Sequence, residues 1–119
     1  MSWNVEYIDE FGEWWDGLTE GEQDAIDVVV GLLEDKGPRL PFPYSSGIAG
    51  SKYSHMREPN IKGEPYRVLY AFDPRRTALL LLGGSKGGDD RWYTENVPIA
   101  DRLYDDHLEL LKKEENDDG

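Results

Sequence analysis

The sequence predicts an α+β fold in which helices cover one face of a sheet of about four strands, in the order β-α-α-β-β-β-α. Three observations predict this class. Two helical patterns, at residues 9–18 and 19–37, follow each other near the N-terminus. Three strand-like segments, 52–58, 66–72 and 77–82, lie close enough in sequence to form an antiparallel meander. A third helical pattern lies near the C-terminus.

The first strand is predicted at residues 3–8, where "WNVEYI" alternates and is rich in β-forming side chains. We expect it to join the sheet, either at the edge or in the middle. Residues 9–18 follow as a short helix, because their apolar side chains recur at spacings of three and four. Gly12 and Gly17 weaken this helix, since glycine has a poor helix propensity.

The clearest helix is predicted at residues 19–37. Thr19, with Glu22 three residues later, is the sequence signature of a capping box. Gly37 followed by Pro38 is typical of a helix end. One apolar stripe runs along this helix and should face the sheet; it consists of Ala25, Ile26, Val29, Leu32 and Leu33.

The central third of the chain is predicted to hold one long loop and the meander. Residues 37–51 have three prolines, three glycines and no periodicity, which predicts a loop of the length that is often functional. The strands at 52–58, 66–72 and 77–82 come next. The segment "DPRR" at 73–76 fits a type I turn between the last two strands, with aspartate first and proline second.

The C-terminal third is predicted to begin with a glycine-rich loop at residues 83–93. A helix follows at 97–113, with Pro98 in its first turn, where proline is tolerated. The acidic residues 114–119 are expected to form a disordered tail. Residues 1–113 are therefore interpreted as a single domain.

The composition predicts a soluble, cytoplasmic protein. The chain has 119 residues, which is the size of one ordinary domain. It contains no cysteine, so disulfides, thiolate zinc sites and cysteine nucleophiles are excluded. The N-terminus lacks the basic and apolar regions of a signal peptide. The longest wholly apolar run, "ALLLL", is far too short to span a membrane.

The net charge of −12 is unevenly distributed. Residues 1–50 contain eleven acids and two bases, a net charge of −9, and residues 93–119 contain nine acids and three bases, a net charge of −6. Residues 51–92 contain five acids and eight bases, a net charge of +3. A basic centre thus lies between acidic flanks, which can be solvated helix faces that aid solubility.

A cationic cleft is predicted from the register of the meander. If "DPRR" closes its hairpin symmetrically, Arg67 lies beside Leu82, and Lys86 follows just beyond. If the preceding turn is also symmetric, Arg57 faces Arg67 directly. Two opposed arginines repel each other unless an anion lies between them, and guanidinium groups bind phosphate oxygens well. The alternative is that these cations only pair with surface acids, namely Glu58, Glu64, Asp89 or Asp90.

Other candidate sites have little support. Two carboxylate pairs, Asp24 with Asp27 and Asp105 with Asp106, lie on predicted solvent faces and are not expected to act as acid and base. The two histidines, His55 and His107, stand alone in the sequence and lack the spacing of metal ligands. No metal site and no cofactor are expected.

Four segments together resemble the RelE/HigB superfamily of type II toxin–antitoxin toxins, and its phage-derived HigB-like branch in particular. They are "GIAGSKYSHMRE", "YRVLYAF", "LLLLGGSK" and "IADRL", in this order. The resemblance extends from about residue 3 to residue 113. It implies a RelE-like fold and a ribosome-dependent mRNA endonuclease that uses no metal, in which the RNA 2′-hydroxyl attacks the adjacent phosphate.

The resemblance also implies roles for particular residues. By position, Arg67 is expected at the scissile phosphate, Lys86 as the base or a phosphate clamp, and Arg57 as a second phosphate contact. Neighbouring arginines would lower the pKa of a lysine base. Trp92 and Tyr93 would either stack on an RNA base or pack in the core. The candidate RNA-binding residues are Lys52, Arg91, Trp92 and Tyr93.

The implied partners are the ribosome with its mRNA and a cognate helix-turn-helix antitoxin of the HigA/Xre type. Operator DNA would be reached only through that antitoxin, and no membrane is involved. Two other functions stay open. The chain could be a non-catalytic RelE-like module that binds a helix-turn-helix partner through its acidic helices, or a ParE-like gyrase inhibitor. The lysine and the strand arginines favour the nuclease over the gyrase inhibitor, whereas the acidic flanks favour the interaction module.

Overall fold

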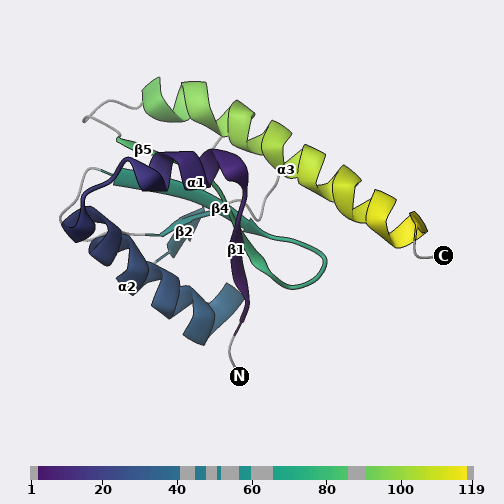
Figure 1. The fold of residues 1–119 in the computed structure, drawn as a ribbon, viewed down its shortest axis with the longest axis horizontal. Coiled ribbons are helices and arrows are strands. Elements are labelled where there is room, and N and C mark those ends of the chain that lie inside the picture. Colours follow the sequence, from purple (N-terminus) through teal and green to yellow (C-terminus); the bar gives the residue numbers. More distant parts are fainter. Residues whose placement is uncertain are drawn as a thin grey trace.

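A computed structural model describes residues 3–40, 45–47, 51, 57–59, 66–85 and 91–117 (Figure 1). Its elements in chain order are β1 (Val5–Tyr7), α1 (Asp9–Asp16), α2 (Glu20–Lys36), the 3-10 helix η1 (Gly37–Arg39), β2 (Ser45–Gly47), β3 (Arg57–Pro59), β4 (Tyr66–Phe72), β5 (Ala78–Ser85) and α3 (Arg91–Asp117). The described strands form one sheet in the order β1-β5-β4-β3-β2. The predicted α+β class is confirmed.

The sheet is mixed, because β1 pairs with β5 in parallel while every other neighbouring pair of strands is antiparallel. The N-terminal strand joins the sheet as predicted, and it lies at an edge. The described strands number five rather than about four, because β2 forms inside residues 37–51, which were predicted to be a loop. The predicted strand at 52–58 is present as β3, and residues 52–56 lie outside the described residues.

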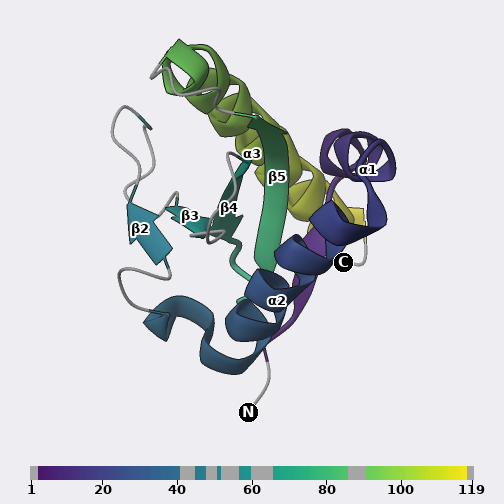
Figure 2. The ribbon, with the colours of Figure 1, turned by 90° about the vertical axis from the view of Figure 1, so that its left-hand side faces the viewer.

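Helices cover both faces of the sheet, so the prediction of one covered face is wrong. The hydrophobic core cluster that includes Val68 and Tyr70 of β4 packs against α1 and α2, whereas the cluster that includes Leu69 and Ala71 packs against α3. Alternate side chains of a strand point to opposite faces, and four consecutive residues of β4 are buried. Both faces of the central strands are therefore shielded from water. Figure 2 shows α1 and α2 on one side of β5 and α3 on the other.

Helix α2 follows the sequence prediction closely. The Thr19 side chain accepts a hydrogen bond from the backbone N–H of Glu22, and the Glu22 carboxylate accepts one from the backbone N–H of Thr19, at 3.2 and 2.7 Å. The capping box is thus confirmed. Gly37 ends the helix with φ of 58°, a conformation that glycine adopts easily. The buried side chains are Ile26, Val29 and Leu33, all from the predicted stripe.

Helix α3 is longer than predicted at both ends. It begins at Arg91 rather than at residue 97, so Pro98 lies inside the helix and not in its first turn. Residues 114–117, which were predicted to belong to a disordered tail, continue the helix. The predicted bounds of the glycine-rich loop, 83–93, are wrong at both ends, because β5 runs on to Ser85 and α3 begins at Arg91.

None of the described helices combines the length and the apolar character needed to cross a membrane.

Gly83 of β5 fixes how α1 packs on the sheet. The ring of Trp14 occupies the place where a Cβ atom at residue 83 would be. Gly83→Ala should therefore lower the free energy of unfolding by about 1–3 kcal/mol through overpacking, as measured by urea denaturation. Gly31→Ala is the matched control: nothing lies within 4 Å of a Cβ there, and alanine in the interior of α2 should stabilise the chain slightly. Equal stability of the Gly83→Ala variant and the wild-type chain would contradict this packing.

Candidate nuclease site

Arg67 lies on β4, on the face of the sheet that α3 covers, and its backbone pairs with Gly84 rather than with Leu82. Two features shift the register from the prediction. The turn comprises Asp73–Thr77, so Phe72 pairs with Ala78. The register then shifts once more between Leu69 and Tyr70. Each feature adds one residue to the β5 side of the hairpin. The assumption of a symmetric turn at "DPRR" does not include either of them.

The predicted pairing of Arg57 with Arg67 is wrong, because Arg57 of β3 lies opposite Tyr70. The side chain of Tyr70 belongs to the core cluster beneath α1 and α2. Directly opposed residues share a face of the sheet, and the next residue along β3 belongs to the other face. Glu58, rather than Arg57, is thus the β3 residue at the face on which Arg67 lies.

Tyr93 joins these two strands to helix α3. Nε of Arg67 donates a hydrogen bond of 3.0 Å to the Tyr93 hydroxyl. That hydroxyl lies 2.9 Å from each carboxylate oxygen of Glu58 and donates toward them. We call these three residues, from β4, α3 and β3, the Arg67–Tyr93–Glu58 cluster. It places a guanidinium, a phenol and a carboxylate at one partly buried point.

The surroundings of Tyr93 keep its hydroxyl protonated. Burial raises the pKa of Tyr93 to about 12, with a further contribution from the hydrogen bond to Glu58, while Arg67 acts in the opposite direction. A phenol with such a pKa is a proton donor throughout the neutral range. The charge-assisted hydrogen bonds to it should hold all three side chains in a fixed geometry.

Two of the other predicted RNA contacts, Arg91 and Trp92, precede Tyr93 at the start of α3. The Trp92 ring packs edge-on against Tyr93, with the ring centroids 5.2 Å apart, and it lies in the core cluster under α3. A Cβ at Gly84 would lie 2.6 Å from Nε1 of Trp92, so the indole depends on a glycine there. Core packing is thus seen for Trp92, and its stacking on an RNA base stays a prediction. Arg91 is exposed at the start of α3, and Lys52 and Lys86 lie outside the described residues.

A second polar cluster lies at the far end of the hairpin, where the sequence predicted Arg75 and Arg76 to be. The Asp73 side chain is 0% exposed and accepts hydrogen bonds from Nη2 and Nε of Arg75, at 2.6 and 2.9 Å. It also accepts from the backbone N–H groups of Arg75 and Thr77. His107 Nε2 lies 3.0 Å from the same carboxylate, and Arg75 also pairs with Glu6 of β1. His107 is therefore not isolated, and these contacts tie the turn to α3 and β1.

This second cluster is structural rather than catalytic, because its carboxylate is enclosed and fully hydrogen-bonded. Burial alone would raise the pKa of Asp73, but the hydrogen bonds from Arg75, His107 and Thr77 outweigh burial and hold its pKa below the usual value. In the part of the chain that the structure describes, no three histidine or acidic side chains lie close enough together to hold a metal ion.

Comparison with known proteins identifies the family. The family model described as "Phage derived protein Gp49-like" matches residues 13–105. The chain belongs to this family. Among curated relatives, "Putative toxin HigB3" of Mycobacterium tuberculosis is 38% identical over 96 residues, which is 80% of this chain and 84% of HigB3. "Putative toxin HigB2" of the same organism is 31% identical over 112 residues, which is 91% of this chain but only 55% of HigB2.

Solved structures show the same fold for this Gp49-like chain. The isolated RelE toxin of Escherichia coli matches with a TM-score of 0.62 and 10% identity, over 82% of this chain and 99% of that toxin. The toxin–antitoxin complex RelBE of E. coli matches with a TM-score of 0.59 and 10% identity, over 71% and 96%. The resemblance to the RelE/HigB superfamily of type II toxin–antitoxin toxins is thereby confirmed.

Proposed function

We propose that the chain is a ribosome-dependent mRNA endonuclease that works without a metal. In this reaction the RNA 2′-oxygen attacks the adjacent phosphorus and the 5′-oxygen leaves, so that a 2′,3′-cyclic phosphate and a 5′-hydroxyl remain. The observation that supports it most is the Arg67–Tyr93–Glu58 cluster, because it brings three chemically complementary groups from three elements to one point. The resemblance to the RelE/HigB toxins, which the 38% identical HigB3 supports, implies the same reaction class.

Arg67 is proposed to bind the scissile phosphate. A guanidinium presents five N–H donors in a planar fork, of which the hydrogen bond to Tyr93 uses Nε. Negative charge develops on the phosphate oxygens as the 2′-oxygen attacks, and a fixed cation stabilises that charge. Arg57 is not kept as a second contact to this phosphate, because it pairs with Tyr70 and so belongs to the other face of the sheet. Lys52, Arg91 and Trp92 are proposed as contacts to the rest of the RNA.

Proton transfer needs a base for the 2′-hydroxyl and an acid for the 5′-oxygen. Tyr93 is proposed as the acid, because its raised pKa keeps the hydroxyl protonated and a departing alkoxide is more basic still. Two residues are candidates for the base. Glu58 is already beside Tyr93, and Lys86 is assigned by its position in the sequence. The sequence had suggested Glu58 only as a surface partner of the cations.

A Glu58→Gln substitution distinguishes the two candidate bases. The amide retains the size of the side chain but cannot take up a proton, so cleavage should fall by about 10²-fold or more. Cleavage of a reporter mRNA on translating ribosomes measures this. Glu95→Gln on the exposed side of α3 is the matched control and should cleave normally. If the Glu58→Gln variant cleaves the mRNA at the wild-type rate while the Lys86→Ala variant does not, Lys86 is the base.

The chain is further proposed to be held inactive by an antitoxin. The E. coli RelBE structure and the M. tuberculosis RelBE2 structure, which matches with a TM-score of 0.55, are both toxin–antitoxin complexes. A helix-turn-helix protein of the HigA/Xre type is the proposed partner, through which the pair would reach operator DNA. Co-expression with such a partner should restore the growth of cells that the chain alone arrests.

A further inference from the structure

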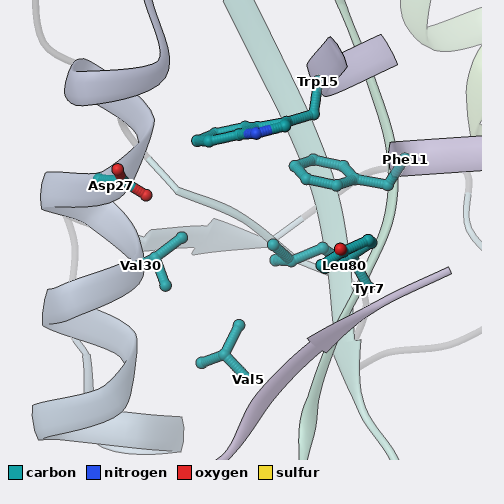
Figure 3. Close-up of a pocket in the computed structure, with 7 residues that line it drawn as sticks. All are labelled: Val5, Tyr7, Phe11, Trp15, Asp27, Val30 and Leu80. Atoms are coloured by element: carbon teal, nitrogen blue, oxygen red, sulfur yellow. The ribbon is translucent and has the colours of Figure 1, made fainter. Parts of the chain in front are cut away.

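An open apolar pocket lies between α1, α2 and β1, on the face of the sheet opposite to Arg67. Its volume is about 260 Å³. Figure 3 shows Phe11 and Trp15 reaching from α1 toward Val30 and Asp27 on α2. The remaining wall comes from the strands; its residues are Val5 and Tyr7 of β1 and Leu80 of β5.

One large aromatic side chain of this pocket remains in contact with water. Tyr7 is 66% exposed although it lines the pocket. Phe11 is buried at the base, with its ring 6.1 Å from that of Tyr7 and 6.3 Å from that of Trp15. The aromatic rings therefore form a preassembled wall beside open space. Pockets that combine an apolar wall with a few polar groups are typical binding sites.

The two helices that border the pocket are strongly acidic. Helices α1 and α2 contain ten carboxylates and one lysine, Lys36. Asp27 lines the pocket itself and, among the residues that the structure describes, makes no hydrogen bond or ion pair. A charge distribution of one sign around a cleft attracts ligands of the opposite sign.

We propose that this pocket between two acidic helices, the α1–α2 groove, binds a basic amphipathic segment of a protein partner. An apolar side chain of that segment would enter the pocket, and its lysines or arginines would face the carboxylates. RNA is disfavoured because its phosphates would be repelled, and a second copy of this chain is disfavoured because the same acidic surface would oppose itself. The groove does not depend on the nuclease assignment, because the Arg67–Tyr93–Glu58 cluster lies on the other face.

The test uses a fluorescent synthetic peptide in which leucine and tryptophan alternate with lysine at helical spacing, and fluorescence anisotropy as the readout. Tyr7→Ala and Asp27→Lys should each weaken binding about tenfold, which corresponds to about 1.4 kcal/mol. Both residues are exposed, so the fold should tolerate either change. Asp106→Lys on the exposed side of α3 makes the same change in net charge elsewhere and should alter the affinity by less than about twofold. A peptide with glutamate in place of lysine should not bind.

Three results would overturn the proposal. Equal weakening by Asp27→Lys and Asp106→Lys would show diffuse attraction between opposite charges rather than a site. A failure of the basic peptide to bind at micromolar concentration would show that the pocket does not take such a segment. A homodimer in sedimentation that Tyr7→Ala dissociates would make a second copy of the chain the occupant. Growth arrest and mRNA cleavage are separate readouts, so none of these results bears on the nuclease.

Discussion

Arg67→Ala is expected to abolish growth arrest by the induced chain and to lower mRNA cleavage by about 10²–10³-fold. Removing one donor that stabilises a developing oxyanion typically has an effect of this size, about 2.7–4 kcal/mol. The substitution also removes the hydrogen bond that Tyr93 accepts, so the proposed acid would lose part of its orientation. Growth curves after induction and primer extension on a reporter mRNA measure the two effects.

Two variants control this experiment. Arg39→Ala removes an exposed arginine of η1 and should leave both arrest and cleavage intact. Arg67→Lys keeps the charge but loses the planar fork, so its activity should lie between those of alanine and arginine. Arrest of undiminished strength with Arg67→Ala would remove Arg67 from the proposed site.

Asp73→Ala is expected to have the largest effect on stability, lowering the free energy of unfolding by about 3–5 kcal/mol. The carboxylate is 0% exposed and accepts hydrogen bonds from Arg75, His107 and two backbone N–H groups. Its removal leaves the backbone N–H of Thr77, a buried residue, without this acceptor. Urea denaturation measures the loss, and Asp106→Ala on the surface should change stability by no more than about 0.5 kcal/mol.

The stabilisation by Asp73 should also depend on pH in a definite direction. Its pKa is lowered in the folded chain, so the folded state favours the charged carboxylate. The contribution is therefore present above the ordinary carboxyl pKa of about 3.9 and is lost as the pH falls through the lowered value. The stability difference between the wild-type chain and Asp73→Asn should be constant near neutral pH and shrink below about pH 4. A difference that grows on acidification would contradict the assignment.

The sequence correctly predicted the elements whose bounds depend on residues that are close together in the chain. Strand β4 has the predicted bounds, and the capping box of Thr19 and Glu22 begins α2 as expected. The elements whose predicted bounds were wrong depend on tertiary contacts. Residues 91–96 join α3 because Trp92, Tyr93 and Val97 pack on the sheet, and β5 continues through two glycines because Trp14 and Trp92 cover them.

The candidate site was predicted only in part, because its geometry also depends on tertiary contacts. Arg67 and Tyr93 were named from the sequence, but their contact across 26 residues could not be read from spacing. Glu58 was missed as a site residue because the symmetric register placed Arg57 on the face that Glu58 occupies. The observed β3–β4 register pairs Arg57 with Tyr70, three residues beyond the predicted partner Arg67, and a shift by an odd number of residues exchanges the two faces of a strand. His107 looked isolated because its partner, Asp73, lies 34 residues away.

The most direct test of the proposed nuclease site is to map the ends of an mRNA after incubation with the purified chain and translating ribosomes. The proposed mechanism predicts cuts with 5′-hydroxyl and 2′,3′-cyclic phosphate ends for the wild-type chain, and their loss with Arg67→Ala and Glu58→Gln. Intact mRNA with the wild-type chain, or undiminished cuts with Arg67→Ala, would contradict it.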